Sequence, residues 1–202
     1  MKNQAYSFFR CPVQRIFGRR HSRQIGKEIS FSFVELVDHF FNGKIMSAEN
    51  RIRELGITLR PASSPAANYC NAVRWGDLIF LAGKGPATSG EAPLSGKLGA
   101  EYSTEEGFQF ARSAALDLIG VLRDELGSLD RVARIVELQG FINATDDFSA
   151  HAAVMDGASN LFAEVFGEKG VHARSVLGAS SLRSGLPVIL RAVVGVDGKE
   201  EL

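Results

Sequence analysis

The residues best suited to chemistry lie in one stretch, which runs from His172 to Val194. Arg174 stands near the start of a short predicted strand, 173–179, and a second strand is predicted over 187–196. A guanidinium is costly to bury unless an anion pairs with it. Arg174 therefore either pairs with a carboxylate of the protein or faces water, or it holds the carboxylate of a small ligand through two parallel hydrogen bonds. The sequence leaves both interpretations open.

Few other residues suggest a catalytic group. His172 lies two positions before Arg174 and could act as a general base or have only a structural role. Ser175 follows Arg174, but no base is near it in sequence, so we do not expect nucleophilic catalysis by Ser175. No cofactor-binding motif is present, and no histidine has metal-ligand spacing. We therefore expect neither a cofactor nor a metal.

Composition limits the compartment and the partners. The only two cysteines, Cys11 and Cys70, have no metal-type spacing and predict no disulfide framework, which favours a reducing, cytoplasmic location. No apolar run approaches the ~20 residues that span a bilayer, so we expect no membrane segment. The net charge is zero, but residues 1–45 hold eight basic and three acidic residues. The remaining residues, 46–202, have a net charge of about −5, which argues against binding to nucleic acid.

The helices and strands that must position Arg174 are predicted from turn and helix-cap residues. A short helix is predicted over 47–56, and two strands over 69–75 and 77–83 are separated by a tight turn at Gly76. The segment after Gly83 reads as a loop that contains Lys84, whose charge either faces the cleft or is solvated.

A capping box at 103–106 begins a long helix that Gly127 ends. A strand over 131–143 follows, and a second helix is predicted to begin at Asp147 and to stop at Gly167. The order from Tyr69 is therefore β-β-α-β-α-β-β, an α+β fold with both helices on one face of a mixed sheet. The other face would need a partner.

The domain organisation predicted here is a basic extension over 1–45, poorly ordered or not translated at all, followed by one domain over 46–202. The extension holds five arginines and no acid in its first 27 residues, which is also compatible with organelle targeting. A short helix is predicted from Phe33 to Phe41.

Several strings in this order resemble the RidA/YjgF family, also called endoribonuclease L-PSP proteins, which has a chorismate-mutase-like fold. The resemblance covers about 60–202, and its strings are AANYC at 66–70, GDLIFLAG at 76–83, GFIN at 140–143 with Asp147-Phe148, HARS at 172–175 and the closing Leu-Pro-Val strand. It implies a homotrimer with sites between subunits, which agrees with the uncovered sheet face.

The resemblance also implies a function and a site. Such proteins hydrolyse reactive enamines and imines made from amino acids, releasing ammonia and a 2-keto acid. Arg174 falls on the family's carboxylate-binding arginine, Tyr69 on a tyrosine that lines the pocket, and Gly83 where the backbone approaches the ligand. Each has an ordinary alternative: Tyr69 could be a half-buried strand tyrosine, and Gly83 a strand-end glycine.

One departure from the family bears on catalysis. Many deaminating members have, in the last strand, a glutamate that positions the attacking water, and Ile189 stands there in this sequence. The loss of a general acid–base group typically lowers a rate ~10²–10⁴-fold. Two alternatives to the deaminase therefore stay open. The first is a regulatory trimer that binds small carboxylates with little turnover. The second is an endoribonuclease, the activity in the family's other name.

Overall fold

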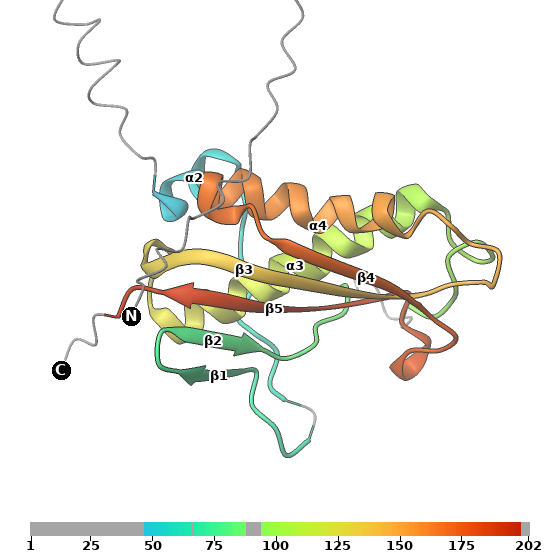
Figure 1. Cartoon of the computed structure of the whole chain (residues 1–202), viewed down its shortest axis with the longest axis horizontal. Coiled ribbons are helices and arrows are strands. Elements are labelled where there is room, and N and C mark those ends of the chain that lie inside the picture. Colours follow the sequence, from blue (N-terminus) through green and yellow to red (C-terminus); the bar gives the residue numbers. More distant parts are fainter. Residues whose placement is uncertain (1–46, 66, 88–93, 199–202) are drawn as a thin grey trace, which may run out of the picture. The chain divides into compact units, whose positions relative to one another are not determined.

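The computed structural model describes residues 47–65, 67–87 and 94–198. The predictions for 1–45, including the helix from Phe33 to Phe41, lie outside the described residues. Figure 1 shows the helices and strands of the described part. In chain order they are α2 (Ala48–Glu54), β1 (Ala72–Trp75), β2 (Leu78–Leu81), α3 (Thr104–Leu126), η1 (Leu129–Arg131), β3 (Val132–Asn143), α4 (His151–Phe166), η2 (Gly167–Gly170), β4 (Ala173–Ala179), η3 (Arg183–Gly185) and β5 (Val188–Val196).

Helix α3 begins and ends as its residues predict. The Ser103 hydroxyl accepts from the Glu106 N–H at 3.2 Å, and the Glu106 carboxylate accepts from the Ser103 N–H at 2.8 Å. These two bonds satisfy donors that the first turn of a helix leaves free. Gly127 then ends the helix in the left-handed conformation, with φ of 73°.

The predicted start of the second helix was wrong. α4 begins at His151, and its N-cap is Ala150, which makes no side-chain cap bond. Asp147 lies in the preceding turn, where a hydrogen bond from the Thr145 side chain lowers the pKa of its carboxyl. The carboxylate is therefore used inside the turn and is not available to cap a helix. β1 also differs, because it begins at Ala72 and not at Tyr69.

The sheet has the strand order β1-β2-β5-β3-β4. Only β3 and β4 run parallel, and the other pairs are antiparallel. β4 is therefore an edge strand, and two strands, β5 and β3, separate it from β2. This α+β fold with a mixed sheet is the one that the sequence predicts.

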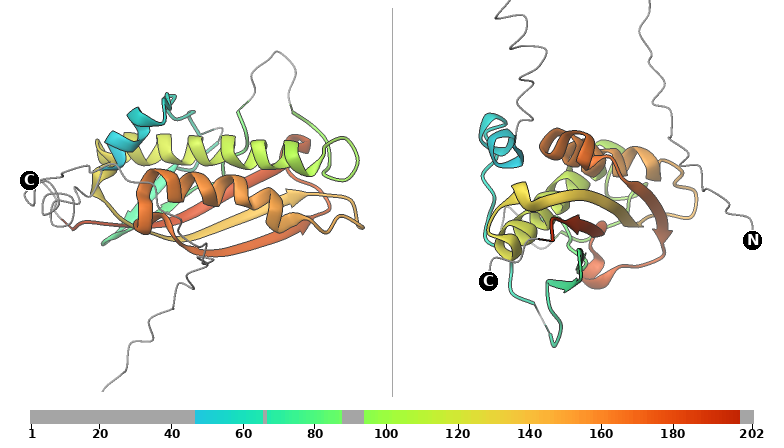
Figure 2. Two further views of the ribbon diagram at one scale, coloured as in Figure 1. Left: turned by 90° about the horizontal axis from the view of Figure 1, so that it is seen from above. Right: turned by 60° about the vertical axis from the view of Figure 1, so that its left-hand side comes forward.

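Both long helices cover the same face of the sheet. Figure 2 shows α3 and α4 lying side by side along it. They approach closely at Gly157, where an added Cβ would lie 2.0 Å from the Phe108 carbonyl oxygen. The core lies between these helices and alternate residues of the strands, such as Ile79, Leu138 and Val194, all fully buried.

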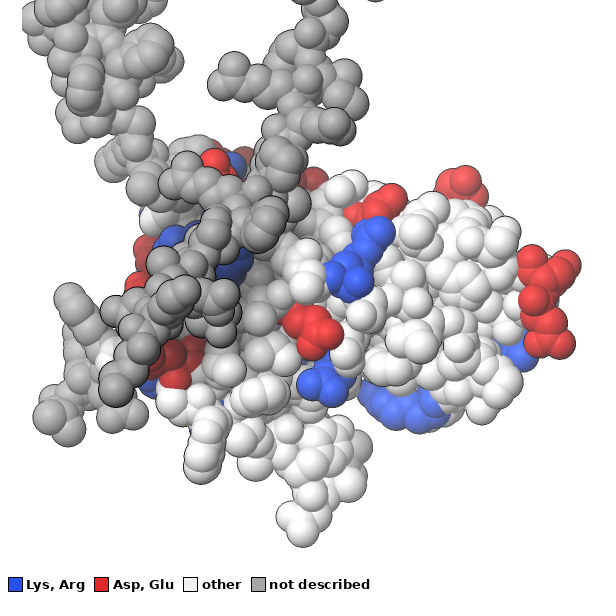
Figure 3. All heavy atoms as spheres, in the orientation of Figure 1, with Lys and Arg blue, Asp and Glu red and all other residues white. Residues whose placement is uncertain are grey.

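The opposite face of the sheet carries apolar side chains, and no helix of the described residues covers them. Phe141 pairs in register with Leu177 and Ile189, and the neighbouring Gly140 faces Met155 of α4. Because side chains alternate along a strand, Phe141, Leu177 and Ile189 point away from the helices. Leu177 is 52% exposed. Figure 3, which looks onto the strands, shows broad uncharged areas on this face.

Candidate functional site

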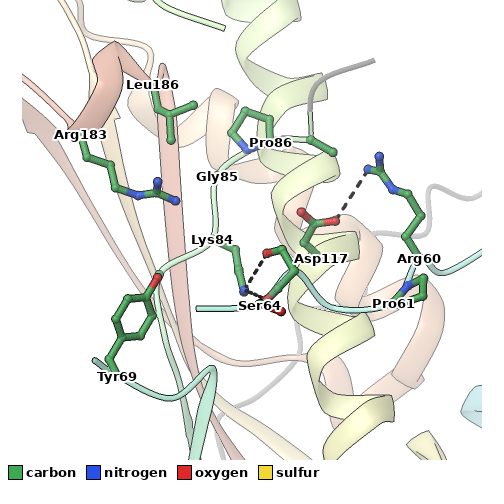
Figure 4. A pocket seen from close by; sticks show the side chains of 13 residues that line it. Arg60, Pro61, Ser64, Tyr69, Lys84, Gly85, Pro86, Asp117, Arg183 and Leu186 are labelled. Atoms are coloured by element: carbon green, nitrogen blue, oxygen red, sulfur yellow. Dashed lines mark hydrogen bonds and ion pairs between the residues drawn. The ribbon is translucent and has the colours of Figure 1, made fainter. Parts of the chain in front are cut away.

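A cavity of about 430 Å³ opens at the end of β2. Its walls come from the chain after β2, from α3, from the segment that precedes β1, and from η3. Figure 4 shows its charged side chains converging from these elements. The residues that line it are Arg60, Pro61, Ser63, Ser64, Tyr69, Gly83, Lys84, Gly85, Pro86, Ala87, Asp117, Arg183 and Leu186.

Lys84 is a buried cation in this cavity. Its backbone continues the sheet beyond β2, since its N–H donates to the Leu190 carbonyl at 2.8 Å and its carbonyl accepts from the Leu190 N–H at 2.8 Å. The residue is only 7% exposed. The interpretation that the Lys84 charge is solvated is therefore wrong.

Among the described residues, the Lys84 ammonium has only neutral hydrogen-bond partners. Nζ donates to Asn71 Oδ1 at 2.8 Å and to the Ser63 hydroxyl and carbonyl oxygens at 3.2 and 3.4 Å. No carboxylate of the described residues forms an ion pair with it. A buried charge is normally paired with an opposite charge. The cavity thus offers a positive charge that an anionic ligand could neutralise.

Asp117, on α3, is the single acid among the described residues that line the cavity. Burial raises the pKa of its carboxyl, against the opposing effects of the Arg60 and Lys84 charges. Arg60 Nη2 lies 3.7 Å from Asp117 Oδ1, and the Arg60 side chain is more than half exposed. A carboxyl with a raised pKa inside a polar cavity is a candidate for proton transfer.

The structure brings together two of the three residues that the sequence singled out. Tyr69 and Gly83 both line the cavity, next to Lys84. Gly83 packs closely against β5, because a Cβ added to it would lie 3.0 Å from Ile189 Cγ2. An apolar side chain therefore occupies the position beside Gly83 where the family's glutamate is expected.

Arg174 does not line this cavity. Its Nη1 donates to Asp156 Oδ1 at 2.7 Å and to the Ser159 hydroxyl at 3.2 Å, both on α4. Arg174 sits on β4, three strand spacings from β2, which corresponds to about 14 Å. Arg174 and Gly83 of one chain are thus too far apart to bind the same small acid. The role of Arg174 as a carboxylate ligand stays a prediction.

His172, like Arg174, contacts the Ser159 hydroxyl of α4. Its Nδ1 lies 2.6 Å from the Gly170 carbonyl, and its Nε2 lies 3.2 Å from the Ser159 hydroxyl. Burial, and to a smaller extent the Arg174 charge, lowers the pKa of His172. The neutral ring can donate from Nδ1 and accept at Nε2. These contacts fit a structural histidine that joins β4 to α4.

Sequence reasoning missed Arg60, Asp117 and Arg183, and it left the role of Lys84 open. Arg60 and Arg183 read as loop residues, and Asp117 as a polar position of an amphipathic helix. In the parts of the chain that the structure describes, no group of three or more His, Cys, Asp or Glu side chains could hold a metal ion. No helix there is long and apolar enough to cross a membrane.

Comparisons with known proteins agree with this fold. Residues 49–188 match the family model described as "YjgF/chorismate_mutase-like, putative endoribonuclease". Protein TCP17 of Trypanosoma cruzi is 38% identical over 147 residues, which are 72% of this chain and 92% of that protein. The crystal structure of Atu1372 from Agrobacterium tumefaciens has a TM-score of 0.69 and 32% identity, covering 79% of this chain and 99% of that one. The structure of a "putative endoribonuclease" from Shewanella oneidensis has a TM-score of 0.71 and 28% identity, covering 74% of this chain and 99% of that one.

Proposed function

Because this chain belongs to the YjgF/chorismate-mutase-like family, we propose that it hydrolyses small imines and enamines of amino acids to a 2-keto acid and ammonia. The observation that carries the proposal is the buried Lys84 ammonium, which lies in a cavity beside Gly83 and Tyr69 and has only neutral partners among the described residues. It is suited to hold the carboxylate that every such substrate carries next to its reacting carbon.

Asp117 supplies the proton transfer that Ile189 cannot. Water attacks the carbon of the protonated imine, the C=N electron pair moves to nitrogen, and the Asp117 carboxylate accepts the proton that the water loses. Asp117 then returns this proton to the amino nitrogen of the adduct. The C–N bond breaks, the hydroxyl becomes the ketone, and its proton leaves with ammonia as ammonium. A carboxyl with a raised pKa is suited to both transfers.

The complete site forms where copies of the chain meet. The uncovered sheet face and the exposed edge strand β4 are surfaces that a closed homotrimer would bury. In that assembly Arg174 of one copy reaches the cavity of another, and the free side of its guanidinium adds a second hold on the substrate carboxylate. We place the reaction in the cytoplasm, since Cys70 is a free, exposed thiol.

The test follows the decay of freshly generated 2-iminopropanoate by its release of pyruvate. Full-length protein should accelerate the decay, and Arg174→Ala should lower the acceleration about tenfold by removing a charged hydrogen-bond donor. Arg134→Ala is the matched control, because it removes an exposed guanidinium from β3. Decay no faster than in buffer would refute the hydrolase. Equal rates for wild type and Arg174→Ala would remove Arg174 from the site.

The alternative that a specific observation favours is a carboxylate-binding trimer with little turnover. Ile189 packs against Gly83 and can neither accept a proton nor hold water. Calorimetry with 2-oxobutanoate distinguishes the two functions. Binding together with imine decay at the background rate would favour the binding protein, and rapid decay would exclude it.

The name endoribonuclease belongs to relatives, and the acidic 46–202 segment offers RNA no general electrostatic attraction.

A further inference from the structure

We infer that the cavity selects a substrate with two anionic groups, a dicarboxylic imino acid. This inference rests on the hydrolase function proposed above and specifies its substrate class. It starts from the charges around the cavity. Among the described residues that line it, three cations, Arg60, Lys84 and Arg183, face one acid, Asp117. Asp117 lies near Arg60, which leaves Lys84 and Arg183 without an ion pair to any described residue.

The two remaining cations come from separate walls. Lys84 follows β2, and Arg183 begins η3, between β4 and β5. Figure 4 shows the Arg183 side chain reaching toward Lys84 from the wall opposite Arg60. A substrate with one carboxylate can neutralise one of these charges. A second carboxylate, at the other end of a short carbon chain, would neutralise both.

The turn that carries Arg183 is fixed by hydrogen bonds and by an uncommon backbone conformation. Ser184 adopts a positive φ of 54°, which costs energy for a residue other than glycine. The Gly185 carbonyl accepts from the Gly96 N–H at 2.9 Å and from the buried Asn143 Nδ2 at 3.4 Å. Strained backbone of this kind is often found beside ligands. The base of the Arg183 side chain is therefore held in place before a ligand arrives.

The two carboxylates have distinct positions in this arrangement. The one next to the imine carbon binds the deep Lys84 ammonium, within the same cavity as Asp117. The distal one binds Arg183, whose planar guanidinium can donate two parallel hydrogen bonds to it. Arg183 is exposed at the cavity rim, so salt weakens this second contact more than the first. The volume of about 430 Å³ falls in the usual range of small-molecule sites.

The experiment compares the affinities of two stable keto acids by calorimetry at low salt. 2-Oxoglutarate carries two carboxylates, and 2-oxobutanoate carries one. Wild-type protein should bind the diacid about tenfold more tightly, which is the effect of one further charged contact at a partly screened position. Arg183→Gln should abolish this preference and leave the affinity for 2-oxobutanoate unchanged. Arg53→Gln, which removes an exposed arginine of α2, should keep the preference.

The outcomes separate the inference from the function on which it rests. Equal affinities of wild-type protein for the two acids, or a preference that survives in Arg183→Gln, would overturn the dicarboxylate assignment and leave the hydrolase standing. Failure of wild-type protein to bind either acid would also overturn the dicarboxylate assignment, whereas only imine decay no faster than in buffer would refute the hydrolase. A preference for 2-oxoglutarate that is lost in Arg183→Gln and kept in Arg53→Gln would establish the substrate class.

Discussion

Replacing Lys84 with methionine is expected to lower kcat/KM for imine hydrolysis about 100-fold. Lys84 carries the buried positive charge of the cavity, and a hydrogen bond to a charged group contributes about 1.5–3 kcal/mol. Methionine keeps most of the side-chain volume and removes the charge. The ammonium that the proposal assigns to the substrate carboxylate is lost, and steady-state kinetics with a series of imine concentrations measures the loss.

Two controls make the Lys84 result specific. Lys169→Met replaces a lysine outside the cavity lining, whose Nζ donates to the Val132 carbonyl at 3.0 Å, and it should leave kcat/KM unchanged. The melting temperature of Lys84→Met should stay close to that of wild type, because the variant also removes the cost of burying a charge. A Lys84→Met protein that is folded and as active as Lys169→Met would contradict the assignment.

Replacing Asp117 with asparagine is expected to lower kcat by about 10²–10⁴-fold, the range typical of a lost general acid–base group. Asparagine has nearly the same shape, but it cannot accept the proton of the attacking water. Binding of 2-oxobutanoate, measured by calorimetry, should persist in Asp117→Asn because Lys84 is intact. The variant thereby separates proton transfer from binding.

The pH dependence gives a second measurement for Asp117. Burial raises the pKa of the carboxyl above its ordinary value of 3.8. The wild-type rate should therefore fall as the pH decreases through the raised pKa, since the protonated carboxyl cannot act as a base. The folded state binds this proton more tightly than the unfolded state, so the group lowers stability as the pH rises from 3.8 through the raised value.

Asp117→Asn removes both effects. Its residual rate should show no such decrease at acid pH, and its stability at pH 7 should equal or exceed that of wild type. An Asp117→Asn protein that keeps the acid limb of the rate profile, or that turns over at the wild-type rate, would exclude Asp117 from proton transfer.

The fold could be predicted from sequence because its signals are local. The capping box at Ser103 and Glu106 and the terminal Gly127 mark α3 within a few residues of each end. The start of α4 was misplaced because Asp147 is a good cap residue that the turn uses with Thr145 instead. Nothing local distinguishes an aspartate that caps a helix from one that closes the preceding turn.

The site was predictable only in part, because its charges come from distant segments. Tyr69 and Gly83 belong to strings that resemble the family's, and both line the cavity. The direction of the Lys84 side chain depends on Ser63 and Asn71, which approach it only in the folded chain. Asp117 looks like any polar position of a helix until the fold places it opposite the end of β2.

The most direct measurement is a crystal structure of the full chain with 2-oxobutanoate bound. We expect the keto acid in the cavity beside Gly83, with its carboxylate within hydrogen-bond distance of Lys84 Nζ and its keto carbon facing Asp117. A keto acid bound elsewhere, while Lys84 Nζ contacts only Ser63 and Asn71, would contradict it.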